Sequence, residues 1–191
     1  PNIVNKQNIK YAIIWNFPIE KLKEFKNLKV IFSMGAGVDH LFFNDSDLPK
    51  IPIVRLKDPI MQERMLNYVH SQVLNFQVKN YEYFVNQKKS FWDEKYEVLD
   101  NNNLTIGILG AGFLGKFVGK ALQKKGYRVQ AFKKTKSKNT NLKIFFNKKD
   151  LVKFISSSDI IINLLPNTNL TKNFVNKDFL KKMKKKSLLI N

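Results

Sequence analysis

Apolar positions follow two different patterns along residues 104–191. Short apolar runs predict buried strands, and apolar residues spaced by three and four predict amphipathic helices between them. The strands are expected at 104–109, 128–132, 160–165 and 187–191, and the helices at 112–125, 148–156 and 176–185. Strands that alternate with helices are typical of βαβ units, so this region is predicted to form a doubly wound, mostly parallel α/β sheet.

The first half of the chain shows a similar but shorter pattern, followed by one long helical stretch. Apolar runs predict strands at 11–15, 29–33 and 51–56, and a Pro at a first helical position predicts a helix at 18–25. A continuous helical pattern runs from 61 to 87. The turn-forming Asp-Asn-Asn-Asn at 100–103 then marks a new unit. We therefore predict two domains, 1–98 with the long helix included and 99–191.

A Gly-x-Gly-x-x-Gly spacing at Gly110, Gly112 and Gly115 lies between the strand 104–109 and the helix that follows. This is the context that a dinucleotide-binding turn requires. The first glycine permits a tight turn, the second a close approach of the pyrophosphate, and the third helix–strand packing. The helix start offers free N–H groups to phosphate. The candidate cofactor residues are Gly110, Ala111, Gly112, Phe113, Leu114 and Gly115; the alternative is a structural glycine turn of some other α/β protein.

The segment after the second strand of this region indicates which dinucleotide is bound. NAD enzymes commonly place Asp or Glu about 20 residues beyond the glycines, where it binds the ribose 2′-OH. No acidic residue occurs between Lys116 and Lys149, and Lys133, Lys134 and Lys136 occupy the expected place. Lysines attract a 2′-phosphate, so NADP is favoured over NAD, although a general excess of lysine would also fill such a loop.

The apolar run ending near residue 165 is expected to line the same crevice with its carboxyl end. Leu165 and Pro166 are candidates for packing on the cofactor rings, and Thr168 for binding a phosphate. Each of the three equally fits an ordinary strand end.

The composition limits the classes of function. The net charge of +19 comes almost entirely from Lys, beside abundant Asn, Ile and Phe, which fits codon bias better than a dedicated nucleic-acid binder. The chain has no Cys and two His, so thiolate metal sites are excluded and no metal site is predicted. Without an apolar run of bilayer length or a signal-peptide pattern, a cytoplasmic location is expected, with neither nucleic acid nor membrane as partner.

Several collinear motifs make the chain resemble the D-isomer-specific 2-hydroxyacid dehydrogenase family, in particular its glyoxylate/hydroxypyruvate reductase branch. They include "FSMGAGVDHLF", "LPKIPIVRLKDP", "NYVHSQVL", "TIGILGAGFLGKFV", "INLLPNTNLTKNFVN" and "LLIN". The resemblance implies a flavodoxin-like substrate domain, a Rossmann cofactor domain, and reduction of a small 2-oxo acid by NAD(P)H. It also implies that Met34, Gly35, Ala36 and Gly37 bind the substrate carboxylate, in agreement with the anion-binding nest that a glycine-rich turn offers.

The resemblance also implies where the catalytic groups lie. In the family an Arg binds the substrate, and a His with a Glu partner donates the proton; the matching positions lie beyond Asn191. The 191 residues are therefore expected to be a fragment that lacks the first strand and the catalytic part, and to be inactive alone. The full-length protein is expected to be a homodimer. The alternatives are a non-enzymatic dinucleotide-responsive interaction module and, less favoured, a basic nucleic-acid-binding protein.

Overall fold

The computed structural model describes residues 5–35, 37, 50–94, 97–134 and 142–191. The chain forms two compact units, one comprising 1–59 with 166–173 and the other comprising 60–165 with 174–191. The compact units therefore part at 59/60, before the long helical region rather than after it. The assignment of a substrate and a cofactor domain divided at 98/99 stays a prediction.

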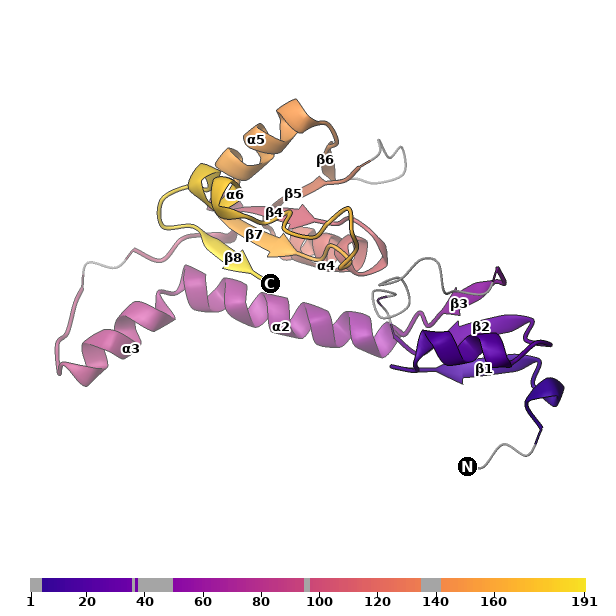
Figure 1. Ribbon diagram of the computed structural model, residues 1–191. Coiled ribbons are helices and arrows are strands. Elements are labelled where there is room, and N and C mark those ends of the chain that lie inside the picture. Colours follow the sequence, from indigo (N-terminus) through magenta and orange to yellow (C-terminus); the bar gives the residue numbers. More distant parts are fainter. Residues whose placement is uncertain (1–4, 36, 38–49, 95–96, 135–141) are drawn as a thin grey trace. The chain divides into compact units, whose positions relative to one another are not determined.

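The first unit contains a three-stranded parallel sheet in the order β1-β2-β3 (Figure 1). Its strands are β1 (Tyr11–Ile14), β2 (Val30–Ser33) and β3 (Ile53–Arg55). Short 3-10 helices η1 (Lys6–Asn8) and η2 (Ile19–Glu24) precede and follow β1. The segment predicted as an α-helix at 18–25 is thus a 3-10 helix, whose Leu22 is buried against the sheet in a core with Ile14, Leu28 and Ile31.

The second unit is a five-stranded sheet whose neighbouring strands are all parallel, in the order β6-β5-β4-β7-β8. The strands are β4 (Thr105–Leu109), β5 (Arg128–Phe132), β6 (Lys143–Phe145), β7 (Ile160–Asn163) and β8 (Leu188–Ile190). The predicted doubly wound α/β class is confirmed. The strand β6 was not predicted, because three residues are too short for alternation to be visible.

Helices cover both faces of this sheet (Figure 1). They are α2 (Pro59–Gln77) and α4 (Phe113–Lys124) on one face and α5 (Lys148–Ser157) and α6 (Lys177–Lys182) on the other. The helix α3 (Asn80–Lys88) follows α2 and buries none of its residues, and a 3-10 turn η3 (Asn101–Asn103) precedes β4. The sequence predicted one helix over 61–87, and this prediction is wrong. Lys79 adopts the left-handed conformation, with φ of 58°, which ends α2 and starts α3 in a new direction.

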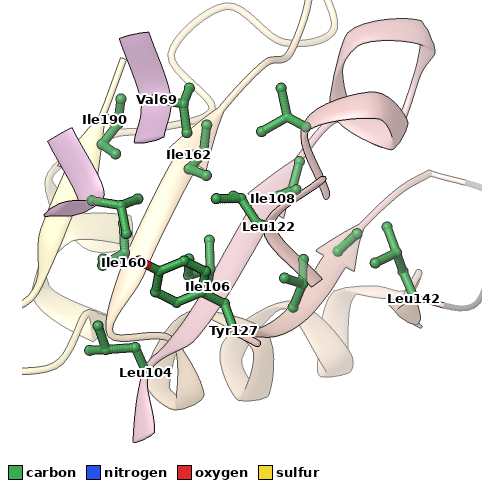
Figure 2. Packing of buried hydrophobic residues seen from close by; sticks show 14 of the residues in the cluster. Val69, Leu104, Ile106, Ile108, Leu122, Tyr127, Leu142, Ile160, Ile162 and Ile190 are labelled. Atoms are coloured by element: carbon green, nitrogen blue, oxygen red, sulfur yellow. The ribbon is translucent and has the colours of Figure 1, made fainter. Parts of the chain in front are cut away.

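Two apolar layers hold the second unit together. On one face α2 and α4 pack on the sheet through Val69, Val73, Val118 and Leu122, and Figure 2 shows this cluster around Ile106, Ile108 and Ile162. On the other face α5 and α6 bury Phe154, Ile155 and Phe179 against Leu109 and Ile161. Burial on both faces explains why 106–109 in β4 and 160–162 in β7 form continuous apolar runs rather than alternating.

A buried polar cluster fastens α2 to the start of β5. The Gln77 side chain donates to the carbonyl oxygen of Leu99 and to the Asn101 side chain, and its Oε1 accepts from the Tyr127 hydroxyl at 2.8 Å. Asn101 in turn donates to the Lys125 carbonyl oxygen at 2.6 Å. Because the polar atoms of Gln77 are satisfied, burying its side chain carries little penalty and fixes the position of α2 on this unit.

Candidate functional site

The strand order reverses between β4 and β7, which lie side by side in the sheet. From β4 the chain moves outward to β5 and β6, then returns to the other side of β4 to form β7 and β8. In open parallel sheets, ligands bind at the carboxyl ends of the strands, at the point where the order of strand addition reverses. The glycine turn follows β4 directly, and Leu164 and Leu165 follow β7, with the Leu164 N–H donating to the Leu109 carbonyl oxygen at 2.9 Å.

Each glycine of the turn has a different environment. Gly110 has φ of +90°, and a Cβ there would lie 2.7 Å from the Leu164 carbonyl oxygen. A Cβ at Gly115 would overlap the Gly110 carbonyl oxygen and lie 3.2 Å from Cγ2 of Ile108. Around a Cβ at Gly112, in contrast, no atom lies within 4 Å. Gly110 and Gly115 are therefore required by the fold, whereas the described protein atoms leave open space around Gly112, where a ligand can approach the backbone.

The start of α4 is open to a ligand. Its N-cap residue is Gly112, which has no side chain to cap the helix, while α5 and α6 are capped by Asn147 and Asn176 through bonds of 2.8 and 2.9 Å to backbone N–H groups. The first N–H groups of a helix without a capping side chain are available to an anion, which the helix dipole also favours. Ala111 is buried below this turn, and Phe113 and Leu114 begin the helix with partial exposure. The geometry therefore fits the pyrophosphate of a dinucleotide.

The lysines predicted to select the dinucleotide lie partly within the described residues. Lys133 and Lys134 follow the carboxyl end of β5 directly, Lys133 half-buried and Lys134 exposed, while Lys136 lies outside the described residues. The Lys133 N–H donates to the Phe145 carbonyl oxygen at 2.9 Å, which holds this segment beside the end of β6. No carboxylate occurs in the chain between residues 116 and 149 to repel a further phosphate.

The strand β7 ends in a turn that sequence reasoning did not assign. The Asn163 side chain accepts from the Leu165 N–H at 3.3 Å and donates to the Asn191 side chain at 2.7 Å. It therefore shapes the turn carrying Leu165, the candidate for packing on the cofactor. The signal was available in the sequence, as a lone polar residue inside the apolar run that ends at 165.

Two further candidates, Pro166 and Thr168, belong to the segment 166–173, which groups with the first unit. There the Thr171 hydroxyl donates to the Pro166 carbonyl oxygen, and the Thr168 N–H donates to that hydroxyl at 2.9 Å. The Thr168 hydroxyl lies 2.9 Å from the same oxygen of Thr171. Thr168 is thus part of a closed turn, and its predicted role in phosphate binding stays a prediction.

In the first unit, the candidate substrate loop starts at the carboxyl end of β2. The Met34 N–H donates to the Ile14 carbonyl oxygen at 3.0 Å, Met34 is about half exposed, and Gly35 and Gly37 are partly buried. Ala36 lies outside the described residues. Arg55 closes β3 at the same edge of this sheet, so the turn has a cationic neighbour.

Of the two histidines, the structure describes only His70. His40 lies outside the described residues, and His70 lies on α2 with its ring 6.2 Å from that of Tyr127. Burial, and secondarily the charge of Lys125, lower the pKa of His70 below its usual value. Within the described part of the chain, no group of three or more His, Asp or Glu side chains is arranged to hold a metal ion, and no helix is long and apolar enough to cross a membrane.

A parallel α/β fold with an open glycine turn at the reversal of strand order defines a dinucleotide-binding protein. Residues 71–191 match the family described as D-isomer specific 2-hydroxyacid dehydrogenase, NAD binding domain. The chain belongs to this family.

Solved structures of the same family are similar over nearly the whole chain. One, from Xanthobacter autotrophicus Py2 in complex with NADPH and MES, is 28% identical with a TM-score of 0.90, over 98% of this chain and 59% of its own. A probable 2-hydroxyacid dehydrogenase from Rhizobium etli CFN 42, in complex with NADP, HEPES and L(+)-tartaric acid, is 30% identical with a TM-score of 0.87, over 96% and 57%.

A third is the NADPH-dependent glyoxylate/hydroxypyruvate reductase from Sinorhizobium meliloti, in complex with NADP and sulfate. It is 28% identical with a TM-score of 0.84, over 94% of this chain and 56% of its own. This chain thus spans a little under three fifths of the length of the structures that it resembles. Membership of the family confirms the resemblance seen in the sequence motifs.

Proposed function

We propose that this chain forms the cofactor-binding part, and a portion of the substrate-binding part, of an NADPH-dependent reductase of small 2-oxo acids. Glyoxylate and hydroxypyruvate are the substrates we favour, since the reductase from Sinorhizobium meliloti is one of the similar structures. The observation that carries the proposal is the open space at Gly112 above the uncapped start of α4. A bound dinucleotide of this kind supplies the hydride.

Different residues of the chain bind different parts of the cofactor in this proposal. The N–H groups of Phe113 and Leu114 hold the pyrophosphate, because Gly112 lets it approach the backbone without steric hindrance. Leu165, positioned through Asn163, packs against the nicotinamide half of the cofactor.

The preference for NADP over NAD rests on charge at the end of β5. Lys133 and Lys134 stand where an NAD enzyme places its carboxylate, and Lys136 follows within the same lysine-rich segment. A cation next to the ribose favours the form with the 2′-phosphate, and no acidic residue of this segment opposes it. Two of the similar structures were solved with NADP and one with NADPH, which supports the same choice.

The substrate is held, in this proposal, by the turn after β2. The backbone N–H groups of Gly35, Ala36 and Gly37 bind the carboxylate of the 2-oxo acid, as such turns bind anions generally. The Met34 N–H, predicted to share this role, already donates to the Ile14 carbonyl oxygen and holds the start of the turn against β1. Polarising the oxo group and protonating the developing alkoxide require a cation and an acid. In this proposal an Arg and a His–Glu pair of the whole protein supply them, as the resemblance to the family implies.

Turnover distinguishes this proposal from a dinucleotide-responsive protein without catalysis. Glyoxylate-dependent or hydroxypyruvate-dependent oxidation of NADPH is measured at 340 nm, for this chain alone and for the chain extended through the Arg, Glu and His positions. The extended protein is expected to turn over and the 191 residues alone to bind NADPH without turnover. An extended protein that binds NADPH and reduces no 2-oxo acid would contradict the proposed reaction.

A homodimeric assembly and a cytoplasmic location complete the proposal. The dimer is supported by a groove of about 1220 Å³ between the end of α2, α3 and the segment that follows α3. Its aromatic side chains are unusually exposed, among them Tyr81 at 75% and Trp92 at 78%, and exposed apolar surface of this kind marks interaction sites. The Asn86 side-chain nitrogen is buried there without a hydrogen-bond partner.

A further inference from the structure

The positive charge of this chain is concentrated in its second half. Residues 99–191 hold 20 of the 34 basic residues but only four of the 15 acidic ones, so they carry 16 of the 19 net positive charges. A genome-wide preference for lysine codons acts on both halves alike and does not remove acidic residues from one of them. The excess of positive charge in residues 99–191 therefore indicates that this half of the chain binds an anionic ligand.

Two pairs of lysines share one edge of the second sheet. Lys133 and Lys134 follow the carboxyl end of β5, and Lys148 and Lys149 follow the carboxyl end of β6 as the first residues of α5. The strands β5 and β6 are parallel neighbours, and the bond from the Lys133 N–H to the Phe145 carbonyl oxygen joins their ends. Lys134, Lys148 and Lys149 are exposed. Four cations thus stand at adjacent strand ends, beside the turn after β4.

The position of Lys148 and Lys149 is unfavourable for the helix itself. Cations in the first turn are repelled by the positive end of the helix dipole, and α5 carries a single acidic residue in that turn, Asp150. Two adjacent lysines also repel each other and the pair after β5. Helix stability does not explain these residues, whereas an anionic ligand at this edge would.

We infer that Lys148 and Lys149 form, with Lys133 and Lys134, an electrostatic capture surface for the anionic dinucleotide and favour the cofactor with the additional phosphate. The inference rests on the proposed function and adds two residues from a different strand end to the recognition of the cofactor. NADPH carries a 2′-phosphate that NADH lacks, so a fixed cluster of cations accelerates its association more. Lys148 and Lys149 act through long-range electrostatic attraction, so they need no direct contact with the cofactor.

The test compares association rates after equal losses of charge at opposite edges of the sheet. Lys148→Gln/Lys149→Gln removes two charges at the carboxyl edge. The matched control, Lys181→Gln/Lys182→Gln, removes two at the end of α6, close to Lys184, which pairs with Asp159 at the amino end of β7. Stopped-flow fluorescence measures NADPH and NADH association at about 20 and 500 mM salt, since salt screens such effects. Circular dichroism melting checks that both variants are folded.

We expect the NADPH association rate of Lys148→Gln/Lys149→Gln to fall on the order of fivefold at low salt, and that of NADH about twofold. The control changes less than about twofold, Lys148→Arg/Lys149→Arg behaves as the parent, and high salt abolishes the differences. Saturable NADPH binding with equal rates in variant and control would overturn this inference and leave the proposed function standing. An equal loss for both cofactors would overturn the phosphate preference, and no saturable binding by the parent would overturn both proposals.

Discussion

Of the three glycines after β4, Gly115 is required for packing and Gly112 leaves space for the cofactor. Replacing each of these two by Ala tests the difference between them. At Gly115 an added Cβ overlaps the Gly110 carbonyl oxygen and lies 3.1 Å from its carbonyl carbon and 3.2 Å from Cγ2 of Ile108. Backbone atoms cannot turn away as a side chain can, so α4 has to move off β4. That movement loosens the packing of Val118 and Leu122, two fully buried residues of α4 that face the sheet.

Overpacking a close contact costs about 1–3 kcal/mol, and we expect Gly115→Ala to lie at the upper end, about 3 kcal/mol, because the clash is with backbone. At Gly112 nothing lies within 4 Å of the added Cβ. The loss of stability there is expected to stay below about 1 kcal/mol, the usual range for exchanging an N-cap residue. The same Cβ fills the space intended for the pyrophosphate, so Gly112→Ala is expected to weaken NADPH binding by about tenfold or more, which corresponds to about 1.4 kcal/mol.

Urea unfolding followed by circular dichroism measures the stability of both variants, and fluorescence titration measures NADPH binding. The expected pattern is a destabilised Gly115→Ala and a stable but binding-deficient Gly112→Ala. A Gly115→Ala protein within about 0.5 kcal/mol of the parent would refute the argument from close packing, because changes of that size are typical of inconsequential surface sites. A Gly112→Ala protein that binds NADPH as the parent does would refute the assignment of the pyrophosphate to this turn.

Three further predictions follow from contacts in the second unit and from the exposed groove. Tyr127→Phe leaves Oε1 of Gln77 buried without its donor, and urea unfolding is expected to show a loss of about 1–2 kcal/mol, whereas an unchanged midpoint would contradict the polar cluster. Since burial and the charge of Lys125 lower the pKa of His70, this side chain binds fewer protons in the folded protein than in the unfolded protein. Stability is therefore expected to fall as pH is lowered through about 6.5, and less steeply in His70→Gln; identical pH profiles would contradict this. Trp92→Glu is expected to shift the proposed dimer to monomer in analytical ultracentrifugation, and a dimer that the substitution leaves unchanged would exclude the groove beside α3 as its interface.

The sequence predicted the strands and helices that have a clear local apolar pattern, and missed features decided by tertiary contacts. The strands β4 and β7 are buried on both faces, so their continuous apolar runs were visible. The short strand β6 owes its existence to pairing with β5, and the break at Lys79 depends on one left-handed residue that no local pattern marks. Helix α6 also ends at Lys182, short of the predicted 185, since the chain must turn there to start β8.

For the candidate site, the sequence identified the glycine turn because the spacing of the glycines and the strand and helix that flank them are all local features of the chain. It did not identify Asn163, whose role arises from bonds to the next turn and to Asn191 at the end of the neighbouring strand. Nor did it identify Lys148 and Lys149, which are only two of many lysines until the pairing of β5 with β6 sets them beside Lys133. Proximity between strand ends is a property of the sheet order and cannot be obtained from spacing along the chain.

The central claim is that the turn at Gly110–Gly115 and the lysines after β5 bind NADP(H) in preference to NAD(H). Parallel fluorescence titrations of the purified protein with NADPH and with NADH, at the same ionic strength, test it most directly. We expect saturable binding of both cofactors with a Kd at least about tenfold lower for NADPH, and a smaller ratio of the two Kd values in Lys133→Asp/Lys134→Ser. Equal or tighter binding of NADH by the unaltered protein would contradict it.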